Sequence, residues 1–317
     1  MANPVISIVM PVHRSFATIE RALKSVLGQD LLVPFELVVS FDDKGDGTKE
    51  ILEKYASTYP DIVRIHPKKK ATGAAGSRYE GVEESRGEFV YFMDSDDELL
   101  PNCLSTLYTA QKISNADCVN CSFYTVKNGK RTSNIFASKG ILTHAQWLDA
   151  YLHDTSFRAF LWTKLIRKSL LQKTPLLLLE EYPDMFEDIA YGFSVLMKAD
   201  TVACISDKLY LYHKDNPSSA TSTPRADRSL YHIAIFACMR QYIESYGTPA
   251  DLRRFFAHKT RYYWSVWFDR LLDKKHGATK EYFIQVKREF DEVMDENLPL
   301  RKVGAFYSPI VSRGILN

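Results

Sequence analysis

The 317-residue sequence has no excess of one charge and no long apolar run. Its 41 basic residues are nearly balanced by 39 acidic ones, so binding to nucleic acid through the charge of the whole molecule is not expected. No apolar run approaches the roughly 20 residues that would span a bilayer, and no basic segment precedes the N-terminal stretch MANPVISIVMPV. These absences predict a cytoplasmic protein that docks, if at all, peripherally at the inner face of the membrane.

Glycine, proline and cysteine are also scarce. With 14 glycines and 13 prolines, the chain is neither collagen-like nor of low complexity. Its five cysteines are an odd number, and only Cys118 and Cys121 lie close together, in a segment with the pattern of a strand. No second pair of Cys or His residues completes a tetrahedral zinc site, so we expect buried free thiols.

The N-terminal half alternates short β-branched or aromatic runs with amphipathic segments. This alternation favours an α/β fold in which a mostly parallel sheet is flanked by helices. The first helix has Ser15 as its expected N-cap. The expected strands and helices alternate along the chain at 5–10, 15–29, 35–41, 48–59, 63–66, 74–85 and 87–93.

Polar residues stand directly after several of the expected strands. Sheets of this kind bind ligands beyond the carboxyl ends of their strands, because the loops converge there and helix N-termini point there. The first strand ends in Pro11, Val12 and the polar His13, the second is followed by Asp42 and Asp43, and the fourth by Asp94, Ser95, Asp96 and Asp97.

Two common phosphate-binding motifs are absent, because neither G-x-G-x-x-G nor a P-loop occurs after a strand. The acidic run at 94–97 is costly to hold together unless a cation neutralises it or it stays solvated. A Mn²⁺ or Mg²⁺ ion held by Asp94 and Asp96 could bridge two phosphate groups. The alternative is a solvated acidic turn that caps the next helix at Asn102.

Six segments are spread over roughly residues 3–220: ISIVMPVHRSFATIERALKSVLGQ, FDDKGDGTKEILEKYA, ATGAAGSRYEGVEESRGEFVYFMDSDDELLP, LWTKLIRKSLL, FEDIAYGFSVLMKA and LYLYHKDNPSSAT. In order and spacing they resemble glycosyltransferase family 2. This resemblance implies a bacterial-type inverting enzyme with the GT-A fold, a Rossmann-like sheet that binds a nucleotide sugar.

The resemblance implies roles for the residues at the ends of the first two strands. Pro11, Val12 and His13 correspond to the loop under the uracil and ribose of a UDP-sugar. Asp42 or Asp43 corresponds to the side chain that accepts a hydrogen bond from the base. The usual V-D-D-G-S-T-D reads SFDDKGDGT here, so both remain candidates, and the alternative is that they are turn residues capping the second helix.

The resemblance also places residues near the diphosphate and the metal. Arg78 corresponds to the basic residue of an A-R-N stretch beside the nucleotide, and it could equally be a structural partner of Asp94. Asp94 would face the ribose and the metal, with Ser95 beside it, while Asp96 corresponds to the direct metal ligand. His213 would touch the metal or the diphosphate, with Ser219 nearby, unless it is a surface histidine after a strand.

Asp188, in the pair Glu187-Asp188, corresponds to the general base of the family. Inversion is a single displacement, in which a carboxylate takes the proton of the acceptor hydroxyl as that oxygen attacks the anomeric carbon. The alternative is an acidic residue in the first turn of a helix, where the helix dipole favours it.

The pattern changes after about residue 222 to long helical periods. We therefore expect a catalytic domain at 1–222 and a helical annex at 223–317, in which aromatic residues such as Phe255 and Phe256 belong to the core. The alternatives are an acceptor platform, a surface for homo-oligomers, or a peripheral membrane contact.

The sequence thus predicts a metal-dependent enzyme that moves a hexose or N-acetylhexosamine from a UDP-sugar to a hydroxyl group. The resemblance implies a glycan, glycoprotein or lipid-linked acceptor. The alternatives are a sugar-phosphate nucleotidyltransferase, which would need a Gly-rich basic loop after the first strand, and a catalytically idle scaffold.

Overall fold

A computed structural model describes residues 3–68, 73–136, 138–153, 160–174, 187–215 and 228–256, and four single positions beyond them. The expected alternation of strands and helices in the first half is confirmed. It consists of β1 (Ile6–His13), α1 (Ile19–Leu27), β2 (Phe35–Asp42), α2 (Thr48–Thr58), β3 (Val63–Pro67), α3 (Gly73–Glu84) and β4 (Phe89–Phe92).

The first strand and helix differ from expectation at their junction. β1 continues through Pro11 to His13, whereas its pairing with β4 ends at Val9. Pro11 therefore has a neighbouring strand on one side only, where its missing N–H is tolerated. Ser15 is not the N-cap of α1. Thr18 holds that position, and the Ser15 carbonyl accepts the N–H groups of Thr18 and Ile19 in the preceding turn.

The second half is less regular. Short strands and helices surround two long strands, β6 and β10. The elements are β5 (Glu98–Leu99), α4 (Cys103–Ser114), β6 (Cys118–Lys127), β7 (Lys130–Asn134), β8 (Gly140–Thr143), α5 (His144–His153), the 3₁₀ turn η1 (Leu161–Thr163), β9 (Lys164–Arg167), α6 (Lys168–Gln172), α7 (Glu187–Leu196), β10 (Thr201–His213) and α8 (Arg228–Tyr246).

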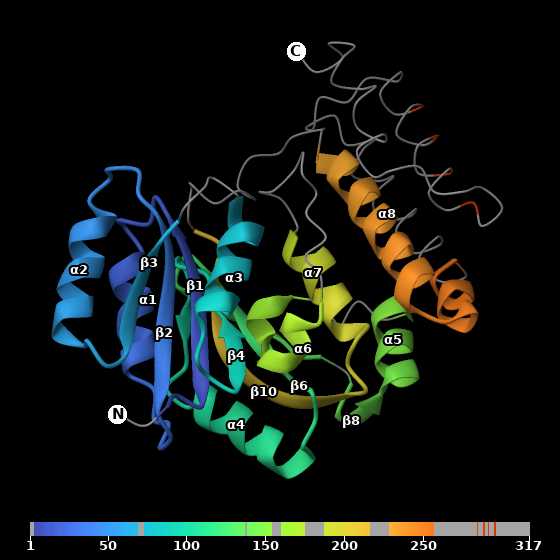
Figure 1. The fold of residues 1–317 in the computed structure, drawn as a ribbon, viewed down its shortest axis with the longest axis horizontal. Helices are drawn as coiled ribbons and strands as arrows, with labels where there is room; N and C mark the ends of the chain where they lie inside the picture. Colours follow the sequence, from blue (N-terminus) through green and yellow to red (C-terminus); the bar gives the residue numbers. More distant parts are fainter. Residues whose placement is uncertain are drawn as a thin grey trace.

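One sheet runs through the described residues in the order β3-β2-β1-β4-β9-β6-β10-β5 (Figure 1). β1 pairs in parallel with β2 and β4, β2 with β3, and β6 with β10. β9 is antiparallel to both β4 and β6, so β6 and β10 run in the same direction as β4. The carboxyl ends of the parallel strands β1, β2, β3, β4, β6 and β10 therefore lie at one edge of the sheet, which we call the carboxyl edge.

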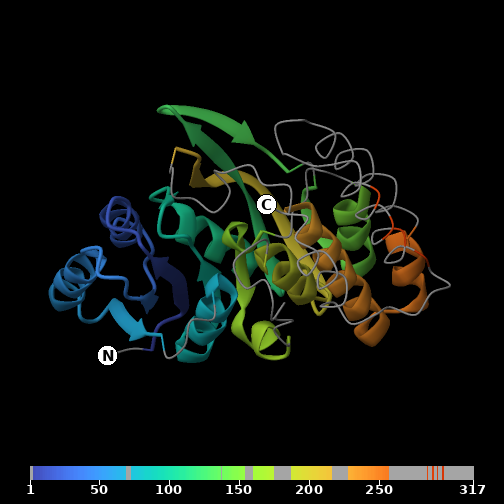
Figure 2. The same ribbon diagram turned by 90° about the horizontal axis from the view of Figure 1, so that it is seen from above.

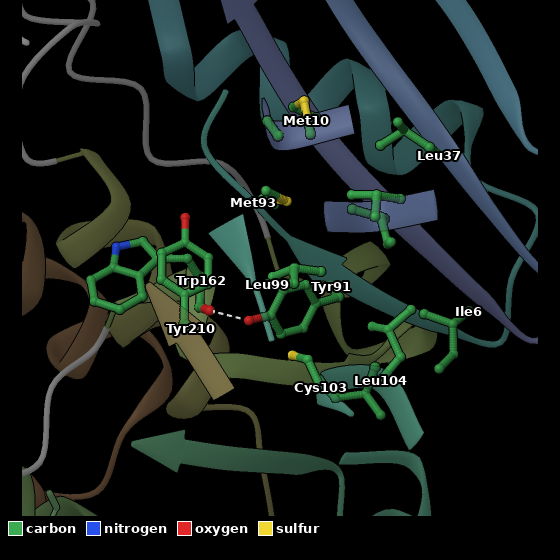
Figure 3. Close-up of a cluster of buried hydrophobic side chains, with 14 of the residues drawn as sticks. Ile6, Met10, Leu37, Tyr91, Met93, Leu99, Cys103, Leu104, Trp162 and Tyr210 are labelled. Atoms are coloured by element: carbon green, nitrogen blue, oxygen red, sulfur yellow. Dashed lines mark hydrogen bonds between the residues drawn. The ribbon is translucent and has the colours of Figure 1, made fainter. Parts of the chain in front are cut away.

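Two apolar clusters cover the two faces of the sheet. The first joins β-strand residues to α5, α6, α7 and α8, and the second joins them to α1, α2 and α4. In the second cluster, the buried Tyr91 hydroxyl donates a 2.5 Å hydrogen bond to the Trp162 carbonyl oxygen (Figure 3). Trp162 is 5% exposed and stacks on Tyr210, so it is a packing residue of this cluster.

All five cysteines are buried and free, as the sequence predicted. Cys118 and Cys121 lie in β6 and not in a metal-binding turn. Burial raises the pKa of both thiols to about 12, which makes them poor nucleophiles and poor metal ligands at neutral pH.

Helix α8 packs against α7 at the opposite end of the sheet from α2 (Figure 1). Its residues Phe236 and Tyr242 belong to the first apolar cluster, together with the fully buried Phe255 and the partly buried Phe256. The expected domain boundary near 222 and most of the predicted annex lie outside the described residues. Among the helices that are described, none has the length and apolar character required to cross a membrane.

Candidate active site

The carboxyl ends of β1 and β2 bring His13 and Asp42 side by side. The two residues are partners in the strand register, and His13 Nδ1 lies 3.2 Å from Asp42 Oδ2. Lys44 Nζ lies 3.1 Å from the other carboxylate oxygen. Burial alone would raise the pKa of Asp42, but the hydrogen bonds and charges of Lys44 and His13 outweigh it and lower the pKa. Asp42 therefore stays ionised.

Neither Asp42 nor Asp43 caps the second helix. The N-cap is Gly47, and the carboxylate of Asp46 before it accepts the N–H groups of Thr48, the first residue of α2, and of Phe16. Asp43 is exposed and accepts the Gly45 N–H at 2.9 Å. The acidic residue that contacts the start of α2 is therefore Asp46, and the ionised Asp42 remains at the strand end.

The loop after β1 touches the loop after β4. Ser15 Oγ and Ser95 Oγ form a 2.7 Å hydrogen bond, and the Ser15 N–H donates to Thr48 Oγ1 at 3.1 Å. The ends of β1, β4 and the start of α2 are thus fixed to one another. Polar residues predicted from three separate segments of the sequence meet at the carboxyl edge.

Arg78 is 5% exposed, and its guanidinium donates to Asp94 Oδ1 at 2.7 Å. The arginine reaches Asp94 because α3 packs tightly on β1. A Cβ atom at Gly81, one turn further along α3, would lie 2.4 Å from Val9 Cγ1. The structure therefore brings the predicted pair together, as both interpretations of Arg78 require.

Asp97 is completely buried and joins the 94–97 loop to β10. Tyr210 Oη donates to Asp97 Oδ2 at 2.7 Å, and the His213 N–H donates to Oδ1 at 2.8 Å. The Asp94 N–H also donates to Tyr210 Oη, at 3.2 Å. Burial, with the charges of Asp96 and Asp94, raises the pKa of Asp97 well above its usual value, although both hydrogen bonds act in the opposite direction. The loop is therefore joined to β10 through a fully buried carboxyl group whose two oxygens both accept hydrogen bonds.

Asp96 is held through its backbone. The Arg21 guanidinium donates to the Asp96 carbonyl oxygen, and its Nε lies 3.4 Å from Glu98 Oε1. Glu98 Oε1 also lies 2.7 Å from His213 Nε2. A proton on Nε2 would leave the lone pair of Nδ1 as the one that can bind an ion or accept a proton.

The remaining predicted residues lie in β1, in α7 and outside the described part of the chain. Asp188 lies in the first turn of α7, which packs against η1 and α3, and Ser219 falls outside the described residues. Pro11 and Val12 are the last residues of β1 before His13, at the carboxyl edge. Tyr210, Glu98, Arg21 and Asp46 are site residues that sequence reasoning did not single out.

The donor set at the 94–97 loop fits a hard divalent cation. Asp94 and Asp96 supply carboxylate oxygens, which Mg²⁺ and Mn²⁺ prefer, and both side chains are partly exposed at the loop. Within the described residues, however, no group of three or more His, Cys, Asp or Glu side chains is arranged to hold a metal. An ion here would need further oxygen ligands from a substrate, such as the phosphates of a nucleotide.

Solved structures share this architecture. A TM-score of 0.69 and 20% identity relate the chain to residues 1–349 of S. aureus TarS in complex with UDP-GlcNAc, over 95% of this chain and 83% of that fragment. The mannosyltransferase PcManGT from Pyrobaculum calidifontis, in complex with GDP-Man and Mn²⁺, gives a TM-score of 0.57 and 12% identity over 99% of this chain and 85% of that chain. The fold is thus the GT-A fold of glycosyltransferases.

The family follows from the sequence comparison. The model of glycosyl transferase family 2 matches residues 7–173, more than half of the chain, and the protein belongs to this family. It is 28% identical to the uncharacterized glycosyltransferase EpsJ of Bacillus subtilis over 226 residues, 70% of this chain and 64% of EpsJ. It is 30% identical to the cholesterol galactosyltransferase of Borreliella burgdorferi over 217 residues, 65% of this chain. The matched region spans 64% and 59% of the length of these two relatives.

Replacing Tyr210 by Phe should destabilise the protein by about 1–3 kcal/mol, because it leaves one oxygen of the buried Asp97 and the Asp94 N–H without their shared partner. Urea unfolding monitored by circular dichroism measures the loss. Tyr124→Phe is the matched control, since Tyr124 lies in neighbouring β6 and is partly exposed. Equal free energies of unfolding for the two variants would contradict a bracing role for Tyr210.

Proposed function

We propose that the protein is an inverting glycosyltransferase that transfers one hexose or N-acetylhexosamine from a UDP-sugar to a hydroxyl group. The acceptor would be a glycan, a glycoprotein or a lipid-linked saccharide. One observation carries the proposal: the pair His13–Asp42 and the pair Arg78–Asp94 are held at one edge of the sheet, on loops joined by the Ser15–Ser95 hydrogen bond. His13 and Asp42, at the ends of β1 and β2, would bind the base. Arg78 and Asp94, beside the end of β4, would lie near the phosphates on the other side of β1.

The ionised Asp42 would accept a hydrogen bond from the nucleotide base, with His13 and its neighbours Pro11 and Val12 under the base and ribose. Asp94 would face the ribose, while Arg78 balances the negative charge of the site. Asp94 and Asp96 would hold Mn²⁺ or Mg²⁺, whose contribution when bound is to neutralise the charge of the departing diphosphate. His213 and Ser219 would complete the diphosphate end.

Asp188 would take the proton from the acceptor hydroxyl as its oxygen attacks the anomeric carbon. A carboxylate is the proper base for such a displacement, and no covalent nucleophile is required. The position of α7 supports this assignment, because α7 packs against α3, the helix that carries Arg78.

Relatives and neighbours support a nucleotide-sugar donor. TarS is seen in complex with UDP-GlcNAc, and a 26% identical relative from Staphylococcus aureus is named poly(ribitol-phosphate) β-N-acetylglucosaminyltransferase. The Borreliella relative is named a galactosyltransferase. These names disagree in the sugar and the acceptor, so we propose only the class of donor.

A donor-hydrolysis screen tests the proposal. UDP-, GDP-, dTDP- and CMP-sugars would each be incubated with the protein, with added Mn²⁺ or Mg²⁺ and with EDTA. We expect slow release of UDP from UDP-sugars that depends on the added ion. Turnover of GDP-sugars alone would overturn the UDP assignment, turnover unaffected by EDTA would remove the metal, and binding of no nucleotide sugar by calorimetry would overturn the function.

A further inference from the structure

The hairpin formed by β6 and β7 carries a group of cations at its tip. Lys127, Lys130 and Arg131 are all exposed, and Lys214 lies next to them at the end of β10. We call these four residues the basic hairpin. In Figure 2 the two green strands of this hairpin project from the body of the protein, beside the end of β10.

The basic hairpin is rigid. Asn128 and Gly129 both have positive φ angles, 50° and 71°, as in the tight two-residue turns that close hairpins. The Asn128 N–H also donates to Asp215 Oδ2 at 2.8 Å, so the tip is tied to the segment after β10. The cations are therefore presented from a fixed support, which lowers the entropy cost of binding a partner.

The charges at the tip work against stability. Lys127 and Lys130 are direct partners across the two strands, and like charges in such positions repel each other. In the described part of the chain, none of the four cations is in an ion pair. Asp215 is the acidic residue beside them, and its carboxylate already accepts the turn N–H. The tip thus keeps a local excess of positive charge in a chain whose net charge is only +2.

The basic hairpin adjoins the candidate active site. Lys214 follows His213 directly, its N–H donates to the Val126 carbonyl oxygen, and His213 pairs with Val126. β6 and β10 end at the same carboxyl edge as β1, β2 and β4. In the proposed function, Asp42 and Asp94 bind the donor at the ends of β2, β1 and β4. The basic hairpin lies at the other half of that edge, at the ends of β6 and β10, which leaves this half for the acceptor.

Two lysines in or near the basic hairpin lie over aromatic rings of β6 and β10. Lys214 Nζ is 5.7 Å from the ring centroid of Tyr212, which stacks on Trp162, and Lys208 Nζ is 5.6 Å from that of Tyr124. These rings support the lysine side chains, and ammonium and guanidinium groups bind phosphate oxygens. The surface therefore offers the charged contacts that a chain bearing phosphate groups needs.

We propose that the basic hairpin binds the phosphate groups of an anionic acceptor, a glycan or polyol chain joined by phosphodiesters. This inference rests on the proposed glycosyltransferase function and names the chemistry of its acceptor. A membrane of anionic lipids fits the surface less well. Every side chain from Lys127 to Ser133 is polar or absent, so nothing at the tip can insert among acyl chains, and a few cations alone give only weak membrane binding.

The test uses the full chain and a short fluorescent glycerol phosphate oligomer as the probe, with fluorescence anisotropy as the readout. Neutral dextran of similar length and vesicles of phosphatidylglycerol are the comparison ligands. The test variant is Lys127→Glu/Lys130→Glu/Arg131→Glu. The matched control is Lys54→Glu/Lys112→Glu/Lys173→Glu, which reverses three exposed cations that lie away from the carboxyl edge.

We expect the wild type and the control to bind the oligomer with an affinity that falls as salt rises, and the test variant to bind it roughly tenfold or more weakly. A neutral variant, Lys127→Gln/Lys130→Gln/Arg131→Gln, should weaken binding in the same direction, and circular dichroism should show both variants folded. Equal binding by the test variant, or equal binding of dextran, would overturn the proposal, as would vesicle binding without oligomer binding.

Hydrolysis of the donor separates a failure of the hairpin proposal from a failure of the proposed glycosyltransferase function. UDP-sugar hydrolysis in the absence of acceptor should be the same in the wild type and the test variant, because the basic hairpin does not include a donor residue. Loss of oligomer binding with intact hydrolysis supports the hairpin's role. Absence of donor binding in the wild type would refute the proposed function, whatever the hairpin binds.

Discussion

Asp188→Asn is expected to lower kcat for sugar transfer by about 10²- to 10⁴-fold, the usual contribution of a general base. The amide cannot take a proton from the acceptor hydroxyl, yet it has nearly the same shape as the carboxylate. The Kd for the UDP-sugar should therefore stay unchanged. Single-turnover kinetics measures the transfer step and calorimetry measures donor binding, so the two effects can be separated.

Glu83→Gln is the matched control for this substitution. Glu83 is an exposed carboxylate on α3, and losing its charge should leave kcat unchanged. A loss of donor affinity in Asp188→Asn would reassign the residue to the nucleotide site. An unchanged kcat would mean that another group is the base, and that Asp188 only interacts favourably with the N-terminus of α7.

The first half of the fold could be predicted from local patterns. Strands and helices from β1 to β4 have clear periods and follow one another in βα units, whose geometry leaves few topologies. β9 could not be predicted in this way. Its four residues, Lys164–Arg167, enter the sheet antiparallel between β4 and β6, and this placement depends on the packing of Trp162 and Tyr210 and not on the local sequence.

The candidate site was predictable where a residue follows a strand directly. Asp42 and Asp94 were found in this way, because the end of a buried strand fixes the edge to which the next side chain belongs. The Asp97–Tyr210 pair joins residues 113 positions apart, so it depends on β10 lying beside β5. The one-residue shift in SFDDKGDGT hid the role of Asp46, whose hydrogen bonds join the start of α2 to the loop after β1 and are visible only in three dimensions.

Asp96→Ala is expected to reduce metal-dependent turnover of the UDP-sugar by about 10²- to 10⁴-fold, since charge neutralisation by a bound ion contributes several kcal/mol. The reason lies in the few carboxylates available. Asp97 is buried and bound to Tyr210 and His213, and Asp94 already accepts from Arg78. Removing Asp96 therefore takes away a ligand that no neighbouring carboxylate of the loop can replace.

Mn²⁺ binding gives a readout that does not depend on turnover. Electron paramagnetic resonance of Mn²⁺ with UDP should show tight binding to the wild type and much weaker binding to Asp96→Ala. Asp61→Ala, at an exposed turn after α2, should bind Mn²⁺ like the wild type. The fold should persist in both variants, because the hydrogen bond from Arg21 to the carbonyl oxygen of residue 96 is retained in Asp96→Ala. Unchanged Mn²⁺ binding and turnover in Asp96→Ala would take the acidic loop out of the mechanism and leave Arg78 as the main positive charge facing the diphosphate.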